Sequence, residues 1–158
     1  MDTREFLKGV EGFRRLADEH IDLLVPLAKV RQVDAGTMID VQGDPAERFY
    51  ILVQGRVVVV LATDFGVSRN SYIVTSLGPG EMFAWSGMVG NLKYTAGGEA
   101  MTDVTVLEFN VAELEKAFEA DPELGYHFMR SVARTVSSRL RHMQLQFVKQ
   151  AAIRESVE

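Results

Sequence analysis

The feature that most constrains the fold is a long central block, from Val30 to Asn110, in which short β-branched runs alternate with turns that contain glycine. Runs of this kind, separated by turn residues about every ten positions, are typical of antiparallel strands in a sandwich or roll. The predicted strands cover residues 29–33, 37–41, 49–54, 56–62, 71–77 and 101–109. The central block therefore predicts a mainly β fold.

Helical periodicity precedes this block. From Arg4 to Leu27 the apolar residues recur mostly at steps of three or four, which indicates amphipathic helix. Gly9, Gly12 and Pro26 interrupt the pattern. We therefore expect short helices here rather than one long helix.

Helix is also predicted after the block, in residues 110–158. Asn110 is a good N-cap with Glu113 three residues later, which predicts a short helix. Asp121 and Pro122 then form a second helix start, because proline is well tolerated at the first helical position. No proline or glycine follows Gly125, so the second helix is expected to continue to about Ile153.

An apolar stripe runs along this predicted long helix. Its members recur at alternating steps of four and three: Met129, Ala133, Val136, Leu140, Met143 and Phe147. We call these six residues the seam, because this spacing is expected for a two-stranded coiled coil. The seam predicts a homodimer formed through the C-terminal helix. The alternative is that the stripe packs on the chain's own β-block.

Composition and charge narrow the range of functions. At 158 residues, 47% of them hydrophobic, the chain is expected to form one domain spanning residues 1–158, divided into N-terminal helices (1–28), a β-roll (29–109) and C-terminal helices (110–158). A net charge of −5 disfavours direct binding to nucleic acid. There is no cysteine and no apolar stretch of membrane-spanning length, so we expect a cytoplasmic protein without membrane contact.

An ordered series of residues resembles the cyclic-nucleotide-binding domain of the catabolite-activator (CRP/FNR) regulator family. The series is Gly36, Gly43, Asp44, Phe49, Tyr50, Ile51, Leu52, Gln54, Gly55 and Val57, then Leu77, Gly78, Pro79, Gly80, Glu81, Met82 and Phe83, then Thr95, Ala96, Ala100, Thr102, Asp103 and Val104. The resemblance covers nearly the whole chain. It implies a β-roll of the double-stranded β-helix (jelly-roll) type with a long C-terminal dimerisation helix, and no DNA-binding domain within the chain.

The resemblance also implies a phosphate-binding cassette between Phe83 and Thr95. In that family a Phe-Gly-Glu triplet supplies a carboxylate for the ribose, and an arginine holds the cyclic phosphate. Here the triplet becomes Phe83, Ala84 and Trp85, and Tyr94 stands at the arginine position. A phenol does not replace a guanidinium that binds phosphate through two hydrogen bonds, so ordinary cAMP binding is not expected.

The candidate ligand pocket follows from the cassette and the long helix. Its predicted members are Phe83, Ala84, Trp85, Ser86, Tyr94, Thr95, Ala96, Met143 and Gln144. The aromatic residues either line a pocket for a flat or apolar ligand or fill the vacated site as core.

The sequence shows no catalytic motif, so no catalytic residues and no enzymatic activity are predicted. The histidines lie too far apart for a local metal motif, and no metal site is predicted. The leading hypothesis is a ligand-sensing regulatory domain whose cofactor, if any, is unknown. The alternatives are a ligandless dimerisation or interaction module with a plugged pocket, low-affinity cyclic-nucleotide binding through backbone N–H groups, and a haem-based gas sensor using His127 or His142.

Overall fold

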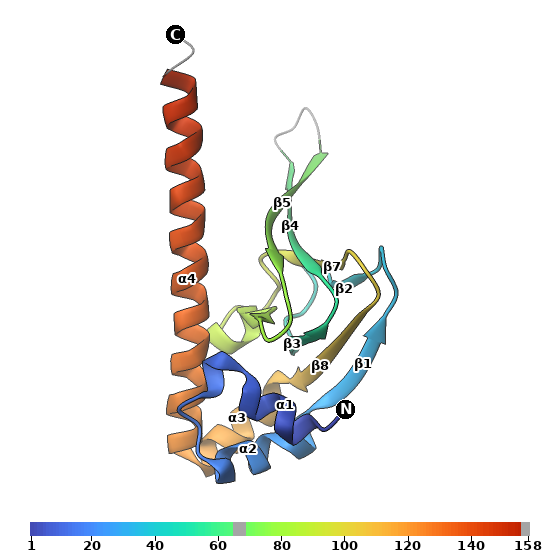
Figure 1. Cartoon of the computed structure of the whole chain (residues 1–158), viewed down its shortest axis with the longest axis vertical. Helices are drawn as coiled ribbons and strands as arrows, with labels where there is room; N and C mark the ends of the chain where they lie inside the picture. Colours follow the sequence, from blue (N-terminus) through green and yellow to red (C-terminus); the bar gives the residue numbers. More distant parts are fainter. Residues whose placement is uncertain (65–68, 156–158) are drawn as a thin grey trace.

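Two four-stranded antiparallel sheets form the centre of the molecule (Figure 1). The computed structural model describes residues 1–64 and 69–155. One sheet has the order β1 (Lys29–Val33), β8 (Val104–Asn110), β3 (Arg48–Gln54) and β6 (Met82–Phe83). The other has the order β2 (Met38–Asp40), β7 (Gly97–Ala100), β4 (Val57–Asp64) and β5 (Arg69–Leu77). The predicted β-roll is confirmed.

The central strand β3 separates two hydrophobic cores. Successive residues of a strand point to opposite faces of its sheet. Phe49 and Ile51 accordingly belong to the core shared with the helices, while Tyr50 and Leu52 belong to the core inside the roll. Burial on both faces explains why β3 is a nearly continuous apolar run rather than an alternating one.

Five short helical segments gather at one end of the roll (Figure 1). They are α1 (Thr3–Gly9), the 3₁₀ turn η1 (Glu11–Phe13), α2 (Asp18–Leu24), the 3₁₀ turn η2 (Val25–Leu27) and α3 (Val111–Ala120). The expected cap of α3 is present, because the Asn110 side chain accepts a hydrogen bond from the Glu113 amide at 3.0 Å. The prediction of short N-terminal helices is also confirmed.

One long helix, α4 (Pro122–Glu155), starts among these segments and runs beside the roll to beyond it (Figure 1). Leu124, Phe128 and Val132 in its first turns are buried in the helical core. The seam is divided: Met129 and Val136 pack partly against the same core, whereas Leu140, Met143 and Phe147 are exposed. In the outer half of the seam, Leu140 and Phe147 are thus mostly exposed, and Met143 is about half covered where it faces the roll.

Three details differ from the sequence prediction. The strand β7 (Gly97–Ala100) was not among the predicted strands. The strand predicted over residues 101–109 begins only at Val104, because residues 101–103 form a bend after β7. The two-residue strand β6 was not predicted, since its pairing of Met82 with Ile51 is visible only in the folded sheet. The predicted C-terminal segment ends with residues 156–158, which lie outside the described residues.

Candidate ligand-binding site

The segment from Gly80 through β6 to the loop before β7 has the backbone of a tight cradle. Gly80 and Gly90 adopt positive φ values of 86° and 88°, which glycine tolerates without steric cost. Between them Ala84 adopts a φ of 59° directly before the 3₁₀ turn η3 (Trp85–Val89). Within the described part of the chain, Ala84 is the one non-glycine residue with positive φ. The surrounding fold therefore imposes the left-handed backbone here, although alanine disfavours it by about 1 kcal/mol.

Close packing holds the η3 turn against the roll. A Cβ atom at Gly87 would stand 2.1 Å from the carbonyl oxygen of Ala46, so only glycine fits at this point. On the other side, the buried Ser86 hydroxyl accepts a hydrogen bond from the Thr95 amide at 3.3 Å. The two ends of the cassette are thus joined directly.

A small inner cavity of about 50 Å³ lies between the cassette, β7 and α4. It is lined by Asp40, Val59, Phe83, Ala84, Trp85, Ser86, Thr95, Ala96, Gly97, Gly98 and Arg139. Phe83 also stacks on Tyr50 in the roll core, with ring centroids 5.2 Å apart. Because Phe83 is almost fully buried, it forms a fixed wall of this cavity.

A larger outer cavity of about 230 Å³ shares several of these walls. It is lined by Val59, Leu61, Val74, Thr75, Trp85, Thr95, Ala96, Arg139 and Met143. Most of these side chains are apolar, and two come from α4. The outer cavity therefore suits the apolar part of a small ligand.

Arg139 of α4 brings a positive charge to both cavities. Its guanidinium carbon lies 4.4 Å from the centroid of the Trp85 ring, a cation–π arrangement, and it donates a hydrogen bond to the carbonyl oxygen of Met82. Burial lowers the pKa of Arg139 to about 10, against the opposing influence of Glu81. The group thus remains charged at neutral pH, and it forms no ion pair with a carboxylate of the described residues.

Asp40 at the end of β2 is a second unusual group at the inner cavity. The residue is 6% exposed, and its Oδ1 atom has no hydrogen-bond partner in the described part of the chain. Burial raises the pKa of Asp40 to about 7, because the interior penalises its charged form. Near neutral pH the side chain is therefore present in both protonation states.

The structure brings most of the predicted site residues together. Phe83, Ala84, Trp85, Ser86, Thr95, Ala96 and Met143 line one or both cavities. Gln144 is exposed on α4 and lines neither cavity. Arg139 and Asp40 were not among the predicted pocket residues.

Tyr94 differs from the expectation that it faces the pocket. Its hydroxyl donates to the Arg48 carbonyl oxygen at 2.9 Å and accepts from the Arg48 amide at 3.0 Å. The side chain is therefore buried at the start of β3, as core, and lines neither cavity. Burial raises the pKa of Tyr94 to about 12, so the phenol stays protonated and keeps both hydrogen bonds.

The comparison with known families agrees with this geometry. The sequence profile described as "Cyclic nucleotide-binding domain" matches residues 30–121, more than half of the chain. The chain belongs to the cyclic nucleotide-binding domain family. The resemblance to the catabolite-activator branch is confirmed as well. The catabolite activator protein of Thermus thermophilus has a TM-score of 0.68 and 25% identity, over 89% of this chain and 62% of that one.

Two further proteins are similar to this chain. A cyclic nucleotide-binding protein of Geobacter metallireducens matches with a TM-score of 0.75 and 26% identity, over 89% of this chain and 99% of that one. A cAMP-dependent protein kinase regulatory subunit of Dictyostelium discoideum is 40% identical over 80 residues, 50% of this chain and 24% of that protein. The chain thus spans about a quarter of the length of this curated relative.

Other sites considered from the sequence lie elsewhere. His142 is exposed and lines neither cavity, and His127 lies 3.9 Å from Glu123 one turn earlier. Among residues 1–64 and 69–155, no group of three or more histidine, aspartate or glutamate side chains is placed to hold a metal ion. The same residues include no helix that is long and apolar enough to cross a membrane.

Proposed function

We propose that this cyclic nucleotide-binding domain senses a small organic anion, bound in the inner and outer cavities beside α4. The observation that carries the proposal is the position of Arg139. A partly buried guanidinium without a carboxylate partner is stabilised when an anion binds to it, because charge-assisted hydrogen bonds are stronger than hydrogen bonds between neutral groups. Arg139 would thereby supply from α4 the cation that the cassette lacks at Tyr94.

The shape and lining of the cavities define the rest of the ligand. Val59, Leu61, Val74 and Met143 offer an apolar wall next to the charge. The outer cavity, at about 230 Å³, is smaller than the 300–1,000 Å³ that is usual for drug-sized ligands. A compact apolar body with one carboxylate or phosphate group fits these requirements best.

Such a ligand would act through the position of α4. It would touch the cassette on one side and two α4 residues, Arg139 and Met143, on the other. A ligand shifts an equilibrium only if it binds one arrangement better than another. Because the ligand would contact both the cassette and α4, its affinity would differ between two positions of α4 relative to the roll. This is a binding role rather than a catalytic one.

The test compares each anion with its uncharged counterpart. Small aromatic and branched-chain carboxylates, each paired with its primary amide, are titrated alongside cAMP, cGMP and phosphate monoesters. Trp85 is the single tryptophan of the chain, so its fluorescence reports directly on the site. The protein is expected to bind at least one anion about tenfold or more tightly than the paired neutral compound, because the amide loses a charge-assisted bond.

Variants of two arginines on α4 test whether Arg139 causes the preference for the anion. Arg139→Gln is expected to abolish the preference for the anion, and Arg139→Lys to keep part of it. Arg141→Gln, at an exposed position outside both cavities, should leave the preference unchanged. A preference that survives in Arg139→Gln would refute the assignment.

A ligandless interaction module is the second candidate, favoured by the small inner cavity and by the use of Tyr94 as core. This reading predicts no change in melting temperature with any compound, since only ligands that prefer the folded state raise it. A Soret absorption band in the purified protein would instead indicate a haem sensor. These three outcomes are mutually distinguishable.

We also propose that the outer half of the seam forms a homodimer. Leu140, Met143 and Phe147 are 55%, 48% and 73% exposed and follow the four-three spacing of a coiled coil. The double variant Leu140→Glu/Phe147→Glu is expected to be a monomer in sedimentation equilibrium, because glutamates of the two chains would bring like charges together in the buried seam. Leu145→Glu, an equally exposed position outside the seam, should remain dimeric. A dimer that persists in the double variant would rule out this interface.

A further inference from the structure

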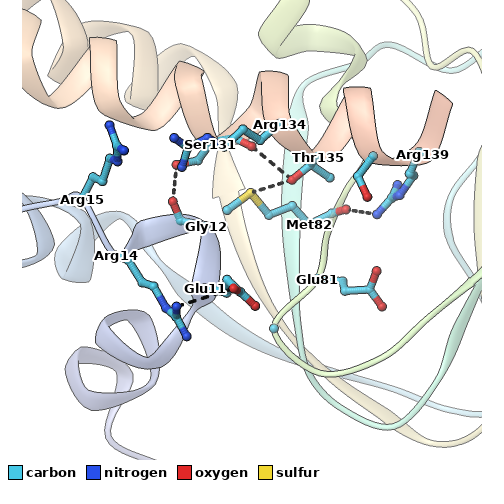
Figure 2. Close-up of a pocket in the computed structure, with 12 residues that line it drawn as sticks. Glu11, Gly12, Arg14, Arg15, Glu81, Met82, Ser131, Arg134, Thr135 and Arg139 are labelled. Atoms are coloured by element: carbon cyan, nitrogen blue, oxygen red, sulfur yellow. Dashed lines mark hydrogen bonds and ion pairs between the residues drawn. The ribbon is translucent and has the colours of Figure 1, made fainter. Parts of the chain in front are cut away.

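A second concave site, which shares only Arg139 with the roll cavities, lies between η1 and the side of α4 (Figure 2). Its volume is about 500 Å³. Four arginines line it: Arg14 and Arg15 from the N-terminal segment, and Arg134 and Arg139 from α4. We call this site the arginine groove.

The charge of the arginine groove contrasts with that of the chain. The whole sequence has a net charge of −5, whereas the groove combines four arginines with two carboxylates, Glu11 and Glu81. Glu11 is already engaged by Arg14 at 3.7 Å. Arg15 and Arg134 form no salt bridge with any described residue. Two cations from different elements are therefore available to one anion.

The walls of the groove are fixed to one another before any ligand arrives. The Ser131 hydroxyl of α4 donates to the Gly12 carbonyl oxygen of η1, as Figure 2 shows. A Cβ atom at Gly12 would stand 2.7 Å from Cε of Met82, so η1 also lies directly against β6. A site whose walls are already in place has less ordering entropy to overcome when it binds.

The groove also stays open in the proposed homodimer. With 3.6 residues per turn, Ser131, Arg134 and Ser138 lie roughly 140–200° around the α4 axis from Met129 and the seam. A partner helix packed along the seam would therefore leave this side of α4 uncovered. The Ser138 hydroxyl lines the groove and has no hydrogen-bond partner among the described residues, so it is available to a ligand.

We propose that the arginine groove binds a soluble phosphate-bearing anion of nucleotide size. A polyphosphate suits it better than a single carboxylate, because only a ligand with several negative oxygens uses guanidinium groups from both elements. The volume of about 500 Å³ lies within the range of small-molecule sites and exceeds what one inorganic phosphate fills. This proposal does not require the sensing function proposed for the roll cavities, although the two sites share Arg139.

The experiment is calorimetric titration of the full chain with ATP and with inorganic pyrophosphate, without divalent cations and at two salt concentrations. ATP is expected to bind once per chain, and more weakly at the higher salt. The variant Arg15→Gln/Arg134→Gln is expected to weaken binding by about tenfold or more. The matched variant Lys116→Gln/Arg141→Gln removes the same charge from exposed positions outside the groove and should bind within about twofold of the wild type.

Four further results would overturn the proposal. One is an equal loss in both double variants, which would mean a general charge effect. Another is loss of ATP binding in Met143→Trp, which fills the outer cavity and would place the nucleotide there. A third is binding to phosphatidylglycerol vesicles without binding to ATP or pyrophosphate, which would indicate a lipid surface instead. Absence of binding to all three probes would equally refute it.

Discussion

Replacing Asp40 with asparagine is expected to remove a large part of the pH dependence of the protein's stability. In the unfolded chain an aspartate ionises near pH 4, whereas burial at the inner cavity raises the pKa of Asp40 to about 7. Between these values the folded state binds more protons than the unfolded state. Stability therefore falls as pH rises through this window and levels off above pH 7.

The size of the effect follows from the same shift. A shift of about three pKa units corresponds to roughly 4 kcal/mol above pH 7, of which about 2.5 kcal/mol develops between pH 5 and pH 8. Urea unfolding at these two pH values should show this loss in the wild type and not in Asp40→Asn. Asp34→Asn, at an exposed position, provides the matched control and should follow the wild-type profile. Parallel profiles for the wild type and Asp40→Asn would contradict the prediction.

The second large effect is expected at Phe128, where α4 joins the rest of the domain. Its ring is fully buried and lies 5.2 Å from Phe13, 5.5 Å from Phe49 and 5.0 Å from Phe118, measured between centroids. These neighbours belong to η1, β3 and α3. Phe128→Ala is expected to lower the free energy of unfolding by about 3–5 kcal/mol, because it leaves a cavity where four elements meet.

A matched variant on the same helix separates burial from residue type. Phe147 is 73% exposed, so Phe147→Ala should change the free energy of unfolding of the monomer by less than about 0.5 kcal/mol. Urea unfolding of both variants at low protein concentration makes the comparison. Equal losses in the two variants would show that α4 is not anchored through Phe128.

Much of the fold was predictable because its signals are local. The glycine-punctuated strands, the Asn110 cap and the Asp121–Pro122 helix start each depend on residues that are neighbours in sequence. The strand β6 was missed for the opposite reason. Two residues carry no periodicity, and Met82–Phe83 forms a strand only because β3 lies beside it.

The site was predicted where it depends on the cassette and missed where it depends on α4. Phe83, Trp85 and Thr95 follow from the glycine framework around them, and all three line the inner cavity. Arg139 lies outside the seam, and the seam alone does not show which other face of α4 meets the roll. A signal was present, because Arg139 follows the buried Phe128 and Val132 and the half-buried Thr135 at steps of four, three and four.

The contacts of the Asp40 and Tyr94 side chains could not be predicted from their positions in the sequence. Strand alternation shows that Asp40 and its neighbour Ile39 point to opposite sides, but not that Gly98 approaches Asp40 closely. A Cβ atom at Gly98 would stand 2.5 Å from Oδ1 of Asp40. Tyr94 stands at the expected place in the cassette, but its long side chain reaches the backbone of Arg48 instead of the cavity. Both outcomes depend on distances between segments far apart in sequence.

Arg139 is the common wall of the outer cavity and of the arginine groove. One guanidinium cannot turn fully toward two compartments at the same time. A ligand that attracts the Arg139 guanidinium into one site would therefore change the affinity of the other site for its own ligand. By thermodynamic reciprocity, the second ligand would change the affinity for the first by the same factor. Because Arg139 contacts both Trp85 and the Met82 carbonyl oxygen, binding of the proposed nucleotide-sized anion in the groove would change the affinity of the roll cavities for the proposed smaller anion.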